Sequence, residues 1–221
     1  MSHSVQPRAG TEHGSDDHRA ANGRVVRLVS GSRASDVDSA GIDHEMAGDD
    51  TTGHGRTGRG VDPASYRQVF RRHAAGVTVV TLDGPSGPIG FTATSVASLS
   101  LDPPLISLSV ASSSSSWPAL LVADTVVVHL LCDGQDDTAR RFASKGIDRF
   151  APPTRWTRLP TGEPLLAETA AWVRARLEHR IATGDHRLLV ARVLQAYSGD
   201  DAAPLIYHDG RYGTITVSGS Q

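Results

Sequence analysis

This chain of 221 residues contains very little cysteine and has almost no excess of charge of either sign. The single cysteine, Cys132, rules out an intrachain disulfide and fits a reducing compartment. The 22 basic and 24 acidic side chains nearly cancel, whereas a protein that binds nucleic acid usually carries a basic excess. The composition therefore argues against nucleic-acid binding.

Long apolar runs are also missing, as are the motifs of several common enzyme classes. No run approaches the roughly 18 apolar residues that a membrane-spanning helix needs, and the N-terminus lacks the apolar core of a secretion signal. The chain contains no G-x-S-x-G, H-E-x-x-H or Walker motif. We therefore expect a cytoplasmic protein without membrane association, and we do not expect a hydrolase.

Residues 1–60 differ in composition from the rest of the chain. They hold ten of the 22 glycines and five of the ten histidines, and their only apolar cluster is Val25–Val29. Such a segment cannot bury enough apolar surface to offset the entropy that ordering it would cost. We predict a disordered tail over residues 1–60 and one folded domain over residues 61–221. The histidines lack the paired spacing of metal ligands, so we expect no metal site.

The predicted domain begins with a helical pattern and then alternates with a period of two. Asp62 and Pro63 are typical of a helix start, and Gly76 suits its end. Short links between the later segments favour antiparallel strands, and the regular alternation of strands and helices in a Rossmann domain is absent. We predict a closed or nearly closed β-barrel with a few short helices. The expected strands are 77–82, 90–101, 104–110, 125–132, 172–181, 186–198 and a hairpin within 204–215, and the later helices are 116–123 and 135–144.

Residues 89–105, IGFTATSVASLSLDPPL, combine a strand pattern with many small hydroxyl side chains. Because alternate residues of a strand point the same way, Thr92, Thr94 and Ser98 would share one face. A second hydroxyl cluster, 109–117, leads into a predicted helix start, a place that favours anions. The residues alone leave two interpretations of residues 89–105 and 109–117 open. In the first, the two segments bind a phosphate and a polyol chain of a ligand. In the second, they are a solvated strand face and a flexible loop.

Six segments carry a resemblance to a known family. They are FRRHAAGVTVVTL, GFTATSVASLSLDPPL, SSSSSWPALL, ARRFASKGIDRF, GDHRLLVARV and PLIYHDGRYG. In this order and spacing, over about residues 63–213, the chain resembles the flavin reductase family, small NAD(P)H:flavin oxidoreductases. The resemblance implies a mainly β fold, the FMN-binding split β-barrel, which is a Greek-key antiparallel barrel with a few short helices.

The resemblance also implies which residues form the site. The candidate catalytic residue is His186, which matches the place where the nicotinamide docks and would orient it rather than act as a base. Three positions depart from the family pattern. Thr94 stands where Asn is frequent, Ser115 where a basic residue is frequent, and His129 where Asn is usual. The residues implied to bind the flavin are Gly90, Phe91, Thr92, Ala93, Thr94, Ser95, Ser109, Val110, Ser114, Ser115, Ser116, Arg141, Phe142 and Tyr212.

The function that the resemblance implies is transfer of hydride from NADH or NADPH to FMN or FAD. A homodimer and a separate monooxygenase that receives the reduced flavin are the expected partners. Two alternatives stay open. The same barrel could hold flavin or haem without turning over NAD(P)H, or it could be an enzyme of the pyridoxamine-oxidase type.

Overall fold

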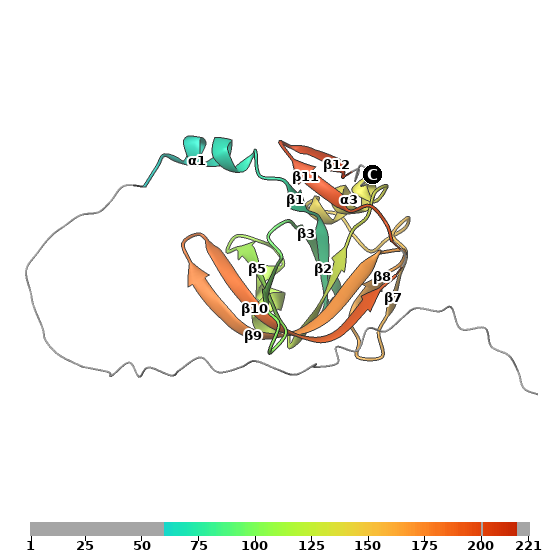
Figure 1. Ribbon diagram of the computed structural model, residues 1–221. Helices are drawn as coiled ribbons and strands as arrows, with labels where there is room; N and C mark the ends of the chain where they lie inside the picture. The colour runs from blue at the N-terminus through green and yellow to red at the C-terminus, as the bar shows by residue number, and fades with distance from the viewer. Residues whose placement is uncertain (1–59, 200, 216–221) are drawn as a thin grey trace, which may run out of the picture.

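The computed structural model describes residues 60–199 and 201–215, and within these ranges the protein is mainly β (Figure 1). The predicted disordered tail lies outside the described residues except for Gly60. The helices are short: α1 (Pro63–Phe70), α2 (Trp117–Val122) and α3 (Asp136–Ala143). Within the described ranges, no helix has the length and apolar character needed to cross a membrane.

Seven antiparallel strands form one sheet, in the order β3-β2-β6-β9-β10-β5-β4. Two small sheets accompany it, one of three strands in the order β1-β11-β12 and one that pairs β7 with β8. The strand bounds are β1 (Ala75–Gly76), β2 (Thr78–Gly84), β3 (Gly87–Ala93), β4 (Ala97–Ser100), β5 (Leu105–Ala111), β6 (Thr125–Leu130), β7 (Trp156–Arg158), β8 (Pro164–Leu166), β9 (Ala171–Thr183), β10 (His186–Ser198), β11 (Leu205–His208) and β12 (Arg211–Thr214).

The large sheet curls around one apolar core (Figure 1). Phe91, from an edge strand at one end of the strand order, and Leu108, from β5 near the other end, belong to the same buried cluster. Strands buried on both sides are rich in β-branched residues, and β2 and β6 carry such runs. The predicted mainly β, antiparallel split-barrel fold is confirmed as a fold class. Within the described residues, no ladder joins the edge strands β3 and β4 to close the barrel.

His129, in the middle of β6, is fully buried and links three strands. Its Nδ1–H donates to the carbonyl of Val79 at 3.0 Å, and its Nε2 accepts the backbone N–H of Leu166 at 3.0 Å. Both ring nitrogens are therefore used by the neutral imidazole. Burial lowers the pKa of His129 to about 4.

Two sequence-based expectations about element bounds are wrong. Asp62 does cap α1, accepting the N–H of Ala64 at 2.9 Å, but the helix ends at Phe70 because Gly76 pairs with Ile206 in a β-ladder. The predicted strand 90–101 breaks after Ala93 into β3 and β4. In both places a partner distant in sequence overrides the local pattern.

Candidate active site

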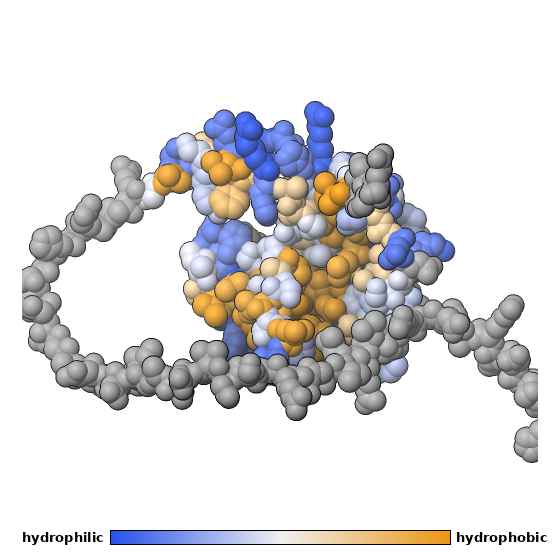
Figure 2. All heavy atoms as spheres, in the orientation of Figure 1, coloured by the Kyte–Doolittle hydropathy of each residue, from blue (hydrophilic) through white to orange (hydrophobic). Residues whose placement is uncertain are grey.

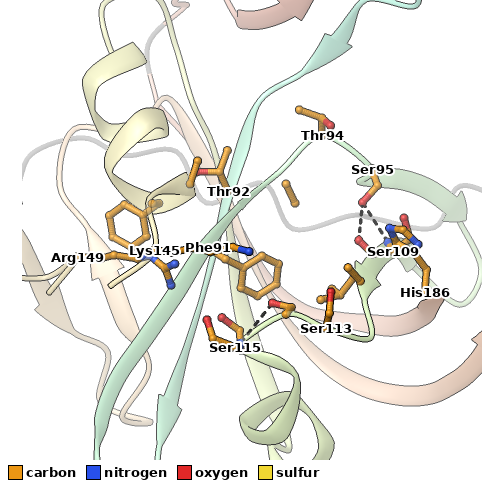
Figure 3. Close-up of a pocket in the computed structure, with 17 residues that line it drawn as sticks. Phe91, Thr92, Thr94, Ser95, Ser109, Ser113, Ser115, Lys145, Arg149 and His186 are labelled. Atoms are coloured by element: carbon orange, nitrogen blue, oxygen red, sulfur yellow. Dashed lines mark hydrogen bonds between the residues drawn. The ribbon is translucent and has the colours of Figure 1, made fainter. Parts of the chain in front are cut away.

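A cavity of about 480 Å³ lies where three segments meet: the end of β3, the serine run after β5 and the turn after α3 (Figure 3). We call it the main cavity. Its volume lies in the range of about 300–1,000 Å³ that is typical of small-molecule sites. Its lining residues are Phe91, Thr92, Ala93, Thr94, Ser95, Ser109, Val110, Ala111, Ser113, Ser114, Ser115, Ser116, Phe142, Ala143, Lys145, Arg149 and His186.

The two ends of the main cavity differ in chemistry. Figure 3 shows Lys145 and Arg149 on one side of Phe91, and Ser109 and His186 on the other. Lys145 is the only lysine of the whole chain. The cavity thus has a cationic end, a middle wall with an aromatic side chain and hydroxyls, and an imidazole end.

Two of the predicted ligand hydroxyls hold the frame of the site. The Ser95 Oγ donates to the carbonyl of Ser109 and accepts the N–H of the same residue, both at 3.0 Å. The Thr92 Oγ1 donates to the carbonyl of Ala139 at 2.6 Å, which fixes α3 against β3. These bonds take up the donor hydrogen of each hydroxyl, so a ligand can only donate to them.

The serine run supplies hydroxyls rather than a helix-start anion site. Ser113 and Ser115 are exposed at the cavity wall. The predicted N-cap, Ser116, makes no side-chain cap bond, and α2 has only six residues. A helix this short adds little dipole, so the expectation of an anion site created by its N-terminus is not supported.

Arg149 is held firmly at the cationic end. Its Nη1 donates to the carbonyl of Gly90 at 2.8 Å, and its Nε and Nη2 donate to the carbonyl of Ser144 at 2.9 and 2.6 Å. Partial burial lowers the pKa of the Arg149 guanidinium, which nevertheless stays protonated at any ordinary pH. A guanidinium carries five N–H groups, so a fixed cation with spare donors faces the cavity.

Gly90 lines not the main cavity but an adjoining hollow of about 210 Å³, which we call the side hollow. The side hollow shares Ser115, Ser116 and Arg149 with the main cavity. A Cβ on Gly90 would lie 2.5 Å from the Phe142 ring, so glycine is needed for α3 to pack this closely. Phe142 is itself fully buried and packs edge-on against Phe150.

Besides Gly90, two predicted site residues are not brought to the main cavity. The Arg141 Nη2 donates to the carbonyl of Pro152 at 3.0 Å, and the side chain lines a separate hollow. The guanidinium carbon of Arg140 lies over the Tyr212 ring, 4.8 Å from the ring centroid. The ring of Tyr212 also packs beside that of Tyr207. The expectation that Arg141 and Tyr212 line the flavin pocket is therefore not met by this cavity.

Sequence reasoning missed the two cations that do line it. Lys145 and Arg149 lie in the segment ARRFASKGIDRF, four and eight residues after Arg141. Gly146, with a φ of 74°, turns the chain after α3 and brings both side chains to the cavity. The one available signal was that the chain's only lysine lies in a segment already singled out. Ala111, Ser113 and Ala143 were also missed.

His186 opens β10 at the other end of the cavity and is half-exposed. Its Nδ1 lies 2.7 Å from the Oδ1 of Asp185, and this hydrogen bond lowers the pKa of the Asp185 carboxyl. A carboxylate partner assigns the proton to Nδ1 and leaves Nε2 as an acceptor. This arrangement suits a side chain that positions a polar ligand.

A larger hollow, of about 730 Å³, lies between α1 and the barrel, and we call it the α1 hollow (Figure 2). It shares Thr94, Ser95 and Ser109 with the main cavity, so the two meet at the imidazole end. Tyr66 and Phe70, whose ring centroids are 4.5 Å apart, line it from α1. The site therefore has room for two ligands side by side.

The residues of the main cavity fit a flavin nucleotide. Phe91 and Val110 offer apolar contacts to a flat ring, Ser113 and Ser115 offer hydroxyls to a polyol, and Lys145 and Arg149 offer charge to a phosphate. Because Gly90 lacks a side chain, α3 lies close enough to β3 for the wall to be continuous. The fit rests on these three chemistries lining one cavity.

Comparison with known proteins agrees with this fit. The family model described as flavin reductase like domain matches residues 70–216. The NADH:FMN oxidoreductase of Rhodococcus erythropolis is 47% identical over 164 residues, which cover 72% of this chain and 85% of that protein. The NADH:FAD oxidoreductase of Streptomyces globisporus C-1027, solved with NAD and FAD fragments, is 31% identical, with a TM-score of 0.68 over 72% of this chain and 96% of that one.

A third similar protein is the reductase subunit HsaB of a flavin-dependent monooxygenase from Rhodococcus jostii. It is 34% identical over 155 residues, which cover 70% of this chain and 79% of that subunit. The chain belongs to the flavin reductase family. The predictions of the family, of an oxidoreductase and of flavin and nicotinamide nucleotides as its cofactors are confirmed at this level.

Proposed function

We propose that this chain binds FMN or FAD in the main cavity and reduces it with hydride from NADH or NADPH. The observation that carries the proposal is the order of chemistries along the cavity, from Lys145 and Arg149 through Phe91 to His186. That order matches the phosphate, the ring system and the redox edge of a flavin.

The bound flavin supplies the hydride-accepting chemistry, so the chain needs no acid–base pair of its own. Lys145 and Arg149 hold the phosphate by charge, and the exposed hydroxyl of Ser115, which lines the side hollow together with Arg149, donates to the same end. Phe91 and Val110 pack against the ring and exclude water from one side. What the protein adds to the reaction is mainly the alignment of two flat rings at contact distance.

His186 acts as a positioning residue for the nicotinamide. Its Nε2 accepts a hydrogen bond from the carboxamide N–H of the nicotinamide, while its Nδ1–H donates to the Oδ1 of Asp185. The α1 hollow, which opens from this end, takes the rest of the nucleotide. Arg67 and Arg71 line that hollow and provide cations for its phosphates.

A second copy of this chain is the proposed partner of α1. No residue of α1 is buried, even though the helix carries three large apolar side chains. Tyr66, Val69 and Phe70 are 53%, 67% and 53% exposed. An isolated helix of eight residues is marginal in water without an apolar contact. In a homodimer this face would be covered, and the two-ligand site would gain a wall.

The product, a reduced flavin, would serve a separate monooxygenase. The similar protein of Rhodococcus jostii is the reductase subunit of such a flavin-dependent monooxygenase. The cytoplasmic location and the single domain over residues 61–221 stay predictions. The alternative of a flavin-binding module without turnover has no observation of its own in its favour.

The test of the proposal is flavin-dependent oxidation of NADH. Purified protein is mixed with NADH or NADPH and with FMN, FAD or neither, and the absorbance of the nicotinamide is followed. We expect rapid loss only when a flavin is present. Tight flavin binding with no loss for either nucleotide would replace the reductase by the binding module.

A further inference from the structure

The loop that carries Arg149 has its backbone carbonyls bonded one after another. We call residues 148–154 the Arg149 loop, and it lies between α3 and β7. Loops usually run over the surface, where water satisfies most of their carbonyls. Here five consecutive carbonyls, those of residues 148–152, each accept a hydrogen bond from the chain itself. The donors are the Arg141 guanidinium for residues 148 and 152, the Thr154 hydroxyl for residue 149, the Trp156 indole for residue 150 and the Thr154 N–H for residue 151.

Two of these bonds fix the backbone at Arg149 directly. The Thr154 Oγ1 donates to the carbonyl of Arg149 at 2.7 Å, and the Trp156 Nε1 donates to the carbonyl of Phe150 at 3.1 Å. The Trp156 ring also packs edge-on against the buried Phe150 ring, with 5.2 Å between the centroids. The main chain from which the Arg149 side chain extends is therefore held at two neighbouring carbonyls.

Trp156 is itself anchored to the large sheet. It opens β7 and pairs with Leu166 of β8, whose N–H donates to the buried His129 at 3.0 Å. His129 belongs to β6, in the middle of the seven-stranded order. A path of bonded groups thus leads from the large sheet through the β7–β8 hairpin to the Arg149 loop.

The position of Arg149 matters because its guanidinium has two tasks. Three of its five N–H groups donate to the carbonyls of Gly90 and Ser144, and the others are left for a ligand in the main cavity. A small displacement of the loop would break this arrangement. A loop that had to be ordered at each binding event would also reduce the affinity for the phosphate.

We propose that Trp156 is a positioning residue for the flavin phosphate. Trp156 lines none of the cavities described above, and it acts by fixing the Arg149 loop so that the guanidinium is in place before the flavin arrives. This inference rests on the proposed function, because it assigns the flavin phosphate to the cationic end. It adds that recognition of the phosphate depends on an indole N–H outside the cavity.

The test compares Trp156→Phe with a matched control, Trp172→Phe. The first variant keeps an aromatic ring against Phe150 but removes the N–H donor. Trp172, on β9, stacks on Tyr197 and lines none of the cavities. Dissociation constants are measured by flavin fluorescence. We expect Trp156→Phe to weaken FMN about fivefold, as loss of one neutral hydrogen bond predicts, and riboflavin less than twofold. Trp172→Phe should change neither constant.

A second variant and a double-mutant cycle show whether the effect passes through Arg149. Thr154→Val removes the hydroxyl bonded to the Arg149 carbonyl with little change in side-chain size, and it should weaken FMN selectively as well. Arg149→Ala should weaken FMN more than riboflavin. In the Arg149→Ala background, Trp156→Phe should have no further effect on FMN, because the group that it positions is gone.

The outcomes separate this inference from the proposed function. Equal effects of Trp156→Phe on FMN and riboflavin, or the same effect on FMN with and without Arg149, overturn the positioning role and leave flavin reduction intact. Unchanged FMN binding in both Trp156→Phe and Thr154→Val overturns it as well. An Arg149→Ala variant that binds FMN as tightly as wild type contradicts the phosphate site of the proposed function itself.

Discussion

Ser95 and Ser109 are joined by two hydrogen bonds through one hydroxyl. The Ser95 Oγ donates to the carbonyl of Ser109 and accepts its N–H, each at 3.0 Å. The pair fixes the corner between β3 and β4 against the middle of β5. Since both residues line the main cavity and the α1 hollow, this one contact sets the shape of both.

Replacing Ser95 by Ala should therefore weaken fold and site together. The loss of two bonds and an unpaired Ser109 N–H predict a decrease of about 1–2 kcal/mol in the free energy of unfolding. Urea unfolding measures it, with Ser98→Ala, an exposed serine of β4, as the control. Equal stability of the two variants would show that the contact does not hold the corner.

Lys145 should contribute to flavin binding through charge alone. Lys145→Ala is expected to weaken FMN about tenfold at low salt, the size of one charge-assisted hydrogen bond, and to weaken riboflavin, which has no phosphate, very little. Lys145→Arg should restore most of the affinity. Arg140→Ala, an exposed cation of α3 outside the main cavity, is the control. Equal losses for FMN and riboflavin would contradict a phosphate at this end.

His186 should affect the rate more than flavin affinity. His186→Ala removes the acceptor for the nicotinamide, so we expect a decrease of about tenfold in kcat/KM for NADH, the loss of roughly one hydrogen bond. The dissociation constant for FMN should stay within about twofold. His208→Ala, an exposed histidine of β11, provides the comparison in the same NADH assay. A His186→Ala variant as fast as wild type would remove His186 from the site.

His129 should make stability depend on pH. The folded state keeps this imidazole neutral down to a pKa of about 4, whereas the unfolded chain protonates near its ordinary value of 6.5. Between these values the unfolded state binds more protons, so the free energy of unfolding falls as the pH falls from 6.5 to 4. The loss is on the order of 3 kcal/mol.

The pH dependence is measured as the difference between wild type and His129→Asn, because carboxylates titrate in acid as well. Asn retains one donor and one acceptor for Val79 and Leu166 but no proton to gain. The variant should lose less stability than wild type between pH 6.5 and 4. Parallel curves would mean that His129 is not the group responsible.

Phe70 tests the proposed dimer. Phe70→Asp places a charge on the apolar face of α1, which has no buried residue to disturb within the chain. We expect light scattering to show a dimer for wild type and a shift toward monomer for the variant. Arg72→Asp, just beyond α1, changes charge without touching the apolar face. A wild-type monomer that binds flavin tightly would contradict the dimer.

The sequence predicts strands well where apolar alternation is strong, as in β2, β6, β9 and β10. It also locates the main cavity, because the two hydroxyl segments meet there. The sequence cannot reveal that the hydroxyls of Ser95 and Thr92 donate to the carbonyls of Ser109 and Ala139, since those partners lie 14 and 47 residues away. Such contacts depend on how strands pair.

The sequence also could not show which cations line the main cavity. Arg141 precedes Phe142, which must face the core, so Arg141 points away toward Pro152. Lys145 and Arg149 reach the main cavity only because α3 ends at Ala143 and the chain turns at Gly146. Helix ends and turns are set by tertiary packing, and a motif alone does not give their direction.

The central claim, a flavin whose phosphate lies at the cationic end of the main cavity, can be tested through the chain's only lysine. An amine-selective acylating reagent is applied with and without saturating ligand, and labelling of the peptide that contains Lys145 is followed by mass spectrometry. The account predicts that FMN slows labelling strongly and that riboflavin at equal occupancy slows it little. Labelling at the same rate with and without FMN, or equal protection by riboflavin, would contradict it.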